Sequence, residues 1–479
     1  MEGLKTTLIK NTSFVVGFDG TQHVLYKHGE VAYRGNEIVY VGKQFSGTAD
    51  AIIDAKEGLV IPGLINLHCH VAASPVEKGF FEDVASKNFY GTELYEYMRC
   101  TQLDVEDQRS VFQFSLAEIL RKGSTTIFEL GFASDEMIQL IGDFGIRSYV
   151  GPMARSCVFM TKDGKSVHYE WDEPQAFKRL EETVDKFHKF DNKFNGRMKI
   201  ALYPGQADCV TPDYLKEVRK VADATGMLIQ IHAAQSVNEY QTILARYGTT
   251  PADYLTENGI AGPDVLYGHY IVPSGHSMNA LKIGNELQTI VETKTNVVHC
   301  PWCFGRRGLI LESFAKYQEM GINMTLGTDT FPQDIIQEMK CAAVFSKIAT
   351  QDTYRTSAAQ VFNTATLNGA KALGRTDIGR LCEGAKADIV IVDIDNMEMS
   401  PLRDPIKALV YSGVSQNIDK VIVDGKTLVD NGNVLGVDHK LLRQQMQAAN
   451  ERMCKKVHTR DYKGRTDIEI APMSFPIIE

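Results

Sequence analysis

Two histidines separated by one residue are the first feature of this chain that could do chemistry. The segment from Ile61 to His70 runs Ile-Pro-Gly-Leu-Ile-Asn-Leu-His-Cys-His. Side chains in a β-strand alternate between faces, so His68 and His70 point the same way if this segment is a strand. Pro62 and Gly63 predict a turn just before it. Two imidazoles on one face can bind the same metal ion.

Three further polar residues follow short apolar runs in the same manner. His232 follows residues 227–231, His269 follows residues 265–268, and Asp329 follows residues 324–328. If each run is a strand of a parallel barrel, these side chains and the histidine pair meet at the carboxyl ends of the strands, where barrels of this type hold their active sites. Imidazoles together with one carboxylate suit a divalent transition metal and leave a position for water.

The ordered set His-x-His, His, His, Asp resembles the amidohydrolase superfamily. Within it, the chain is similar to the branch that holds the adenosylhomocysteine and guanine deaminases and the triazine hydrolases, including atrazine chlorohydrolase. The Pro-Gly-Leu-Ile-Asn before His68 and the Gly-Thr-Asp that ends at Asp329 belong to this pattern. Further landmarks span nearly the whole chain, at residues 116–126, 298–301, 368–374 and 384–390.

The resemblance implies one divalent metal ion, with zinc expected first and iron, cobalt or manganese as alternatives. Its ligands would be His68, His70, His232 and Asp329. Asp329 would take a proton from the metal-bound water, and His269 would stabilise charge that develops on the substrate. The implied activity is hydrolysis through a metal-bound hydroxide, at a non-peptide C–N bond, or at a C–Cl or C–S bond, of a small nitrogen-containing compound such as a heterocycle, urea or carbamate.

One departure from the resemblance bears on the substrate. Deaminases of this branch carry Glu three residues after the third metal-binding histidine, where it passes protons to the leaving nitrogen, whereas this chain has Gln235. Glutamine forms hydrogen bonds but does not titrate. We therefore expect Gln235 to take part in catalysis and substrate binding without acting as an acid. The alternatives are an aminohydrolase of a purine, pterin or triazine, and a non-catalytic scaffold, which the complete ligand set disfavours.

The stretch after the seventh expected strand supplies further candidates for contact with a substrate. They are His299, Cys303, Phe304 and Arg306, together with Gln235. Arg306 and its neighbour Arg307 could bind an anionic group, although solvated loop charges are the simpler interpretation. Residues 300–303 also match the Cys-x-x-Cys of redox proteins, but pocket lining is the favoured role.

One lysine raises the alternative of a site with two metal ions. Lys199 lies on the expected fourth strand, and a carbamylated lysine there would bridge two metal ions, as in binuclear relatives. The presence of one ligand set favours a single ion.

Composition is that of an ordinary globular enzyme. The chain has 479 residues, 44% hydrophobic and 23% charged, and a formal net charge of −9, which argues against nucleic acid as a partner. Nine cysteines without a spacing pattern suggest a reducing compartment. No signal peptide and no apolar run of roughly 18 residues is visible. We expect a cytoplasmic homo-oligomer that binds a small molecule and no membrane.

The pattern of elements predicts an α/β fold with two parts. Residues 62–384 should form a distorted (β/α)8 TIM-like barrel, since strands alternate there with helical stretches such as residues 213–224. Residues 1–61 and 385–436 are rich in short strands, and neither segment alone can bury both faces of a sheet. By the resemblance they should fold together as one small β-sandwich. Residues 437–479 should form a helix and a tail.

Overall fold

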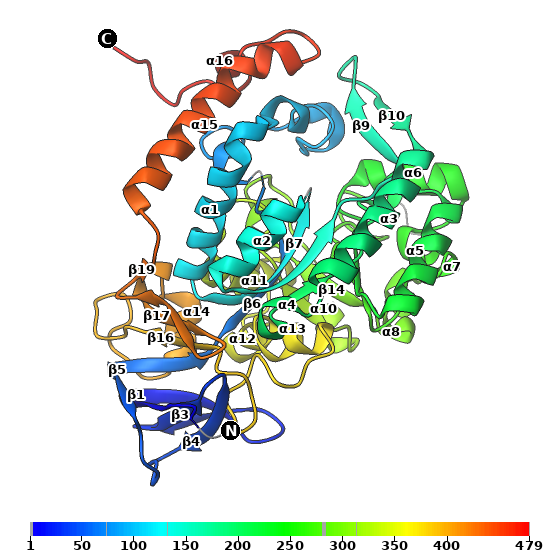
Figure 1. Cartoon of the computed structure of the whole chain (residues 1–479). Helices are drawn as coiled ribbons and strands as arrows, with labels where there is room; N and C mark the ends of the chain where they lie inside the picture. The colour runs from blue at the N-terminus through cyan, green and yellow to red at the C-terminus, as the bar shows by residue number, and fades with distance from the viewer. Residues whose placement is uncertain (1–2, 73, 132, 280–283, 313, 479) are drawn as a thin grey trace.

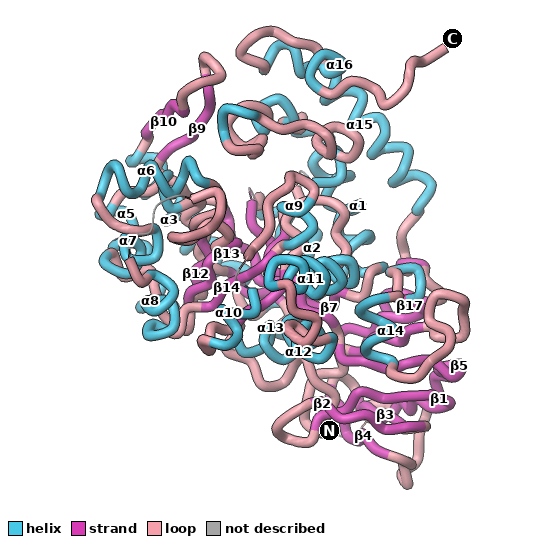
Figure 2. The backbone as a smooth tube through the Cα atoms, turned by 180° about the vertical axis from the view of Figure 1, so that it is seen from behind, coloured by secondary structure: helices cyan, strands magenta, loops and turns pink. Residues whose placement is uncertain are grey.

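The computed structural model describes residues 3–72, 74–131, 133–279, 284–312 and 314–478 (Figure 1). Its elements form one nine-stranded sheet, two four-stranded parallel sheets with helices around them, and a long C-terminal helix (Figures 1 and 2). Across these residues, none of the helices is both long enough and apolar enough to cross a membrane.

Both ends of the chain contribute to the nine-stranded sheet. The N-terminal strands are β1 (Thr6–Phe18), β2 (His23–Lys27), β3 (Glu30–Arg34), β4 (Glu37–Gly42) and β5 (Ala51–Pro62). The strands from later in the chain are β16 (Ile389–Val392), β17 (Ile418–Val423), β18 (Lys426–Asp430) and β19 (Asn433–Val434). The two groups join where β16 pairs antiparallel with β5. A turn at Gly35 and Asn36 joins β3 to β4, which pair antiparallel.

The remaining strands form two parallel sheets and one hairpin. The first sheet has the order β11 (Met198–Ile200), β8 (Arg147–Pro152), β7 (Ser124–Gly131), β6 (Leu64–Cys69), and the second has the order β12 (Ile229–Ala233), β13 (Val265–His269), β14 (Asn296–His299), β15 (Met324–Leu326). The hairpin is β9 (Cys157–Thr161) with β10 (Val167–Trp171). Isolated parallel bridges join the edges of the two sheets, at Leu202 with Ile229, Gln206 with His232, and Cys69 with Asp329.

Helices follow most of the parallel strands and cover them from outside (Figures 1 and 2). They are α1 (Val105–Arg121), α2 (Asp135–Phe144), α3 (Glu173–Phe190), α4 (Lys193–Gly196), α5 (Pro212–Thr225), α6 (Val237–Tyr247), α7 (Pro251–Glu257), α8 (Glu286–Thr293), α9 (Pro301–Gly305), α10 (Phe314–Glu319), α11 (Ile335–Thr350), α12 (Ala358–Thr364) and α13 (Leu367–Ala372). Helix α5 shows why they begin and end where they do. Thr211 accepts a hydrogen bond from the backbone of Tyr214 and Pro212 opens the first turn, while Gly226 ends the helix in a left-handed conformation.

The C-terminal part of the chain returns to the parallel strands. After α14 (Pro405–Tyr411) and the last strands of the nine-stranded sheet come α15 (His439–Arg460) and α16 (Asp467–Ile470). Helix α15 runs beside α1 (Figure 1). Its buried face, including Met446 and Met453, packs on Val76, Phe80 and other apolar residues between β6 and α1. The helix thereby fixes the position of the loop between β6, which carries His68, and α1.

Candidate functional site

The four expected metal ligands converge in the structure. The ligand atoms of His68, His70, His232 and Asp329 all lie within 4.8 Å of one another. Asp329 Oδ1 is 3.2 Å from His70 Nε2 and 3.6 Å from His68 Nε2. The side chains of His70 and Asp329 are 21% and 9% exposed, so solvent reaches the cluster from their side.

Backbone contacts between β6 and the segment after β15 bring Asp329 to the histidine pair. The backbone N–H of Asp329 donates to the carbonyl of His68, and the N–H of His70 donates to the carbonyl of Asp329. Gly327 permits this approach, because a Cβ at that position would lie 2.4 Å from the Cβ of His68. His269 and Asp329 have positive φ angles of 79° and 57°, which are uncommon for residues other than glycine and turn the chain sharply at the strand ends.

Each of the three histidines is held by a neighbour on its other ring nitrogen. His68 Nδ1 lies 2.5 Å from Gln230 Oε1, and His70 Nδ1 lies 2.6 Å from the carbonyl oxygen of Leu130. His232 Nδ1 lies 3.1 Å from the carbonyl oxygen of Gly205 and also from the hydroxyl of Tyr203. With the proton on Nδ1 donated to these oxygens, the lone pair of each Nε2 faces the cluster. This arrangement fits a metal ion, since histidine ligands usually donate their second N–H in this way.

The charges of the cluster depend on one another. Burial alone raises the pKa of Asp329, but the imidazoles of His269, His68 and His70 outweigh it and hold the pKa well below its ordinary value. Burial lowers the pKa of His68, and it lowers that of His232 well below the usual range. For His70 the hydrogen bond and charge of Asp329 outweigh burial and raise the pKa to about 9. The carboxylate therefore attracts positive charge to the point where a metal cation would sit.

His269 lies against the cluster. Its Nε2 is 4.0 Å from Asp329 Oδ2, and its ring centroid is 4.6 Å from that of His68. Burial lowers its pKa well below the ordinary value, so the ring is neutral. Both of its ring nitrogens are buried and have no hydrogen-bond partner among the described residues. Such an imidazole suits contact with a substrate.

The short helix α9 supplies two of the predicted pocket residues. Cys303 Sγ lies 2.9 Å from Asp329 Oδ2, and the ring of Phe304 packs edge-on against His269, with 4.6 Å between centroids. Arg306, just after the helix, donates from Nη2 to Thr330 Oγ1 at 3.0 Å. The structure thus places Cys303, Phe304 and Arg306 around Asp329 and His269.

Gln235 is buried and tied to a hydrogen-bonded chain. Its Nε2 donates to Gln206 Oε1 at 2.5 Å, and Gln206 Nε2 donates to Asp208 Oδ1 at 2.6 Å. The hydroxyl of Tyr169 donates to the other oxygen of Asp208. Gln206 forms a bridge with His232, so this chain of polar groups begins beside a metal ligand.

Other predicted residues lie differently. His299 is buried with its ring against Phe314, outside the group of four converging ligand atoms, and burial lowers its pKa to about 3. Lys199 forms an ion pair with Asp191, with 2.9 Å between Nζ and Oδ2; the binuclear alternative for this lysine stays a prediction. The interpretation of Arg307 as a solvated loop charge is wrong, because its side chain is 9% exposed and pairs with Glu93, whose side chain is 4% exposed.

Sequence reasoning missed the groups that orient the histidines. Gln230 stands two residues before His232 on β12, so strand alternation places both on one face and could have identified it. Tyr203, which contacts His232, carries no such local signal, and neither do Thr330 and Glu93, which contact Arg306 and Arg307; their partners lie 24 to 214 residues away in the chain.

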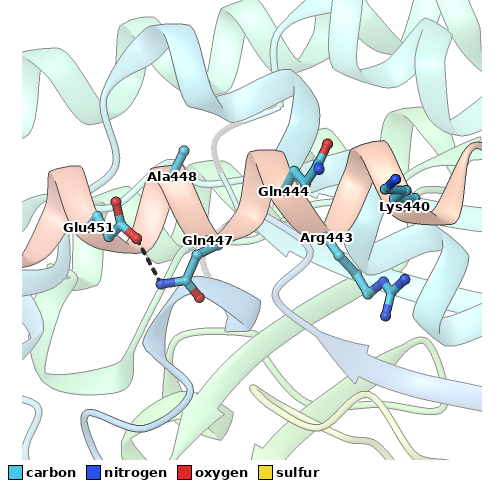
Figure 3. Close-up of a pocket in the computed structure, with 6 residues that line it drawn as sticks. All are labelled: Lys440, Arg443, Gln444, Gln447, Ala448 and Glu451. Carbon is cyan, nitrogen blue, oxygen red and sulfur yellow. Dashed lines mark hydrogen bonds between the residues drawn. The ribbon is translucent and has the colours of Figure 1, made fainter.

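One surface hollow of about 520 Å³ lies on the outward face of α15 (Figure 3). All six of its lining residues come from that helix, and Gln447 donates to Glu451. It holds none of the side chains of the metal cluster.

Comparison with known proteins agrees with the geometry. The model of the amidohydrolase family matches residues 59–428. The 5'-deoxyadenosine deaminase of Methanosarcina barkeri is 28% identical over 94% of this chain and 99% of its own length. The 5-methylthioadenosine/S-adenosylhomocysteine deaminase of Acetivibrio thermocellus is 29% identical over 85% of this chain and 89% of its own length.

Two solved structures have a similar fold. An adenosine deaminase from Xanthomonas campestris with bound zinc superposes with a TM-score of 0.80 at 21% identity, over 93% of this chain and 98% of the other. Atrazine chlorohydrolase from Arthrobacter aurescens TC1, complexed with zinc, gives 0.78 at 22% identity, over 93% and 100%. With three oriented imidazoles and a carboxylate in the family's order and a family match over most of its length, the chain belongs to the amidohydrolase family.

Proposed function

We propose that the protein is a mononuclear metal-dependent hydrolase that acts at an sp2 carbon of a small nitrogen-containing compound. The observation that carries the proposal is the convergence of three imidazole Nε2 atoms and one carboxylate, with each Nδ1 engaged by a neighbouring oxygen. His68, His70, His232 and Asp329 would hold the ion. Zinc is the first choice, since the adenosine deaminase and atrazine chlorohydrolase structures compared above contain it; iron, cobalt and manganese suit the same ligands.

The roles of the surrounding residues follow from their positions. A divalent ion in such a site lowers the pKa of a water ligand toward neutrality. Asp329 Oδ2 faces Cys303 and His269 and accepts the proton of the attacking water. His269, neutral and without a partner of its own among the described residues, donates a hydrogen bond to the substrate atom on which negative charge develops.

The bond that is hydrolysed is a C–N bond, or a C–Cl or C–S bond. The deaminase relatives and the triazine hydrolases among similar structures support this range. The second candidate is an aminohydrolase of a purine, pterin or triazine, which the names of the relatives favour. Gln235 weighs against it, because its amide hydrogen-bonds to Gln206 and cannot deliver a proton. Phe304, Cys303, Arg306 and Gln235 would contact the substrate, and His299 would shape the pocket from behind.

The fold supports a finer division of the chain. We propose that the bridges between the two parallel sheets close a distorted (β/α)8 barrel over residues 62–384. Residues 1–61 and 385–436 would fold as a sandwich around the buried cluster that includes Ile9, Val31 and Ile391. Residues 437–479 form the helical tail. A cytoplasmic homo-oligomer remains a prediction.

A panel assay tests the function. Purified zinc-loaded protein is incubated with amino-, chloro- and alkylthio-substituted triazines, purines and pterins, and the release of ammonia, chloride and thiol is followed separately. We expect turnover with at least one leaving group, and none with His68→Ala, which should also lose zinc. Zinc-loaded wild type that releases no product from the whole panel would favour the scaffold alternative, and release of ammonia alone would favour the aminohydrolase.

A further inference from the structure

A cluster of buried charges lies beside the proposed metal site, and the proton transfers described above do not involve it. Arg307 forms an ion pair with Glu93, which belongs to the loop between β6 and α1. Arg306 stacks its guanidinium on the ring of Phe331, 4.0 Å from the centroid. Its Nη2 donates to Thr330, whose hydroxyl is 3.4 Å from Cys303 Sγ. Since the same sulfur contacts Asp329, three successive contacts link the guanidinium of Arg306 to the proposed base.

Several polar atoms of this cluster are buried without a partner. Nε and Nη1 of Arg306, Nε of Arg307 and Oε2 of Glu93 have no hydrogen-bond partner among the described residues. A buried polar group without a partner destabilises the folded state, because it has lost its hydrogen bonds to water. Native proteins have few such groups, and those that they keep call for an explanation. This cluster therefore has unpaired hydrogen-bond donors on the two arginines and an unpaired acceptor on Glu93.

The charges nearby determine which ligand fits. The positive charge of Arg306 reaches the carboxyl of Glu93, and so does the negative charge of Asp329. A second acidic side chain, Glu77, is also buried nearby, and its carboxyl accepts a hydrogen bond from Thr101. An added carboxylate would satisfy the arginine donors but would meet Glu93 and Asp329 as like charges, and it has no proton to donate to Glu93 Oε2. A ligand group that accepts hydrogen bonds from Arg306 and donates one to Glu93 would pair with both the free donors and the free acceptor.

We propose, on the basis of the function proposed above, that Glu93 and Arg306 recognise a neutral edge of the substrate that carries a C=O beside an N–H. Such an edge occurs in ureides, amides and the lactam forms of nitrogen heterocycles. The carbonyl accepts from the free N–H groups of Arg306, and the N–H donates to Glu93 Oε2. Arg307 is a positioning residue that holds Glu93 in place through the ion pair. The substrate class is therefore a neutral cyclic or open-chain ureide or lactam, and not a carboxylate or phosphate.

Three small probes distinguish these ligand classes by calorimetric titration of the zinc-loaded protein. They are 2-pyridone, which has the complete edge; N-methyl-2-pyridone, which only accepts; and benzenesulfonate, an anion. We expect 2-pyridone to bind at least about tenfold more tightly than either of the others, as sites built to bond an N–H discriminate against analogues that lack it. Equal binding of 2-pyridone and its N-methyl derivative to wild type would overturn the proposal, and so would tighter binding of benzenesulfonate.

Two variants assign the effect to residues. Glu93→Gln removes the negative charge, so the preference should shift by about tenfold or more toward benzenesulfonate. Arg306→Met removes the donors and should weaken 2-pyridone binding to the level of its N-methyl derivative. The exposed pair of Arg109 and Glu136 supplies the controls Arg109→Met and Glu136→Gln, which should change nothing. Unchanged discrimination in both site variants, with normal zinc content, would refute the assignment.

Failure of this inference can be told apart from failure of the proposed function. If zinc-loaded wild type hydrolyses a compound of the panel but the probes bind without discrimination, only the recognition role of Glu93 and Arg306 is wrong. If no compound is hydrolysed and His68→Ala keeps its zinc, the proposed function itself is wrong. Probe discrimination in wild type needs no variant to fold, so the test stands even if Glu93→Gln is unstable.

Discussion

Under the proposed function, single residues at the site divide into those that would hold a cation and those that would transfer protons. The three histidines have their second nitrogens occupied by Gln230, Leu130 and Gly205, which leaves them one function. Asp329 has two functions, because its Oδ1 faces His68 and His70 while its Oδ2 faces Cys303 and His269. The same carboxylate can thus bind the ion and accept a proton.

Replacement of Asp329 tests this double role. Asp329→Asn keeps the volume but removes the proton acceptor and one ligand charge, so kcat should fall by at least about a hundredfold. Turnover is measured per bound zinc, to separate lost chemistry from lost metal. Asp213→Asn is the control, since that side chain is 87% exposed. Activity that survives in Asp329→Asn would show that another group activates the water.

Gln235 tests whether an acid is missing from the site. Its amide donates to Gln206, which donates to the buried Asp208. Glu239 adds a second buried carboxyl, and burial, followed by the charge of Asp208, raises its pKa well above the ordinary value. Gln235→Glu should therefore lower the unfolding midpoint, because a third carboxyl is added to a buried group, and Asp208→Asn in the same chain should restore part of the loss.

The rate of the Gln235→Glu variant on the native substrate is the decisive measurement. We expect no tenfold gain, which would correspond to about 1.4 kcal/mol of transition-state stabilisation. Activity on amino-substituted heterocycles, whose nitrogen must be protonated to leave, should rise. A gain of that size on the native substrate would mean that the reaction needs an acid which the wild type lacks.

At the scale of elements, one buried ion cluster links the nine-stranded sheet to the parallel strands. Arg147, at the start of β8, binds Asp388 before β16 and Asp424 in the turn between β17 and β18. Arg147 is 1% exposed. Removal of one member leaves buried charges uncompensated.

Arg147→Met should lower the free energy of unfolding by about 3–5 kcal/mol, since two buried carboxylates lose their partner. The exposed pair of Lys162 and Glu170 gives the control Lys162→Met, which should change stability by less than about 1 kcal/mol. Denaturant titration of both variants measures the difference. Equal losses would mean that Arg147 does not connect the two parts energetically.

A half-buried histidine in β2, His23, makes the contact with the helices sensitive to pH. His23 Nε2 bonds to Thr366, its ring packs on Phe362, and burial lowers its pKa from 6.5 to about 4. The unfolded chain therefore binds more protons than the folded one between these pH values, so stability falls as pH falls through this window. Between pH 7.5 and pH 5 the loss should be about 2 kcal/mol. His23→Gln should reduce this dependence relative to wild type, whereas His168→Gln, at an exposed position, should not.

At the scale of the whole molecule, the metal should couple the two parallel sheets. Its proposed ligands come from β6, β12 and the segment after β15, which are the edge strands of those sheets. The bridge between Cys69 and Asp329 joins the same edges. Binding at this point ties together segments that are about 260 residues apart in the chain.

Removal of the metal should therefore lower the thermal unfolding midpoint, and zinc should restore it. Ligand present at a thousand times its dissociation constant adds about 4 kcal/mol to stability. His68→Ala should unfold at one temperature with or without zinc. Elemental analysis of wild type should find one ion per chain. A second stoichiometric ion bound through a modified Lys199 would overturn the mononuclear proposal.

The sequence by itself determined which four side chains converge. Strand alternation predicts that His68 and His70 share a face, and the apolar runs before His232, His269 and Asp329 place each at the end of a strand. These features are local, because a strand's faces and ends are encoded within a few residues. The contribution of both chain ends to one sheet also followed from short strand-rich segments that could not bury themselves alone.

Only the tertiary structure decided the partners of the charged and amide side chains. Arg307 pairs with Glu93 across more than two hundred residues, and Gln235 reaches Asp208 through Gln206. The burial of Arg307 depends on the loop between β6 and α1 that covers it, and α15 packs against that loop. No local pattern records such a contact, since its energy comes from desolvation and pairing that exist only after the chain has packed.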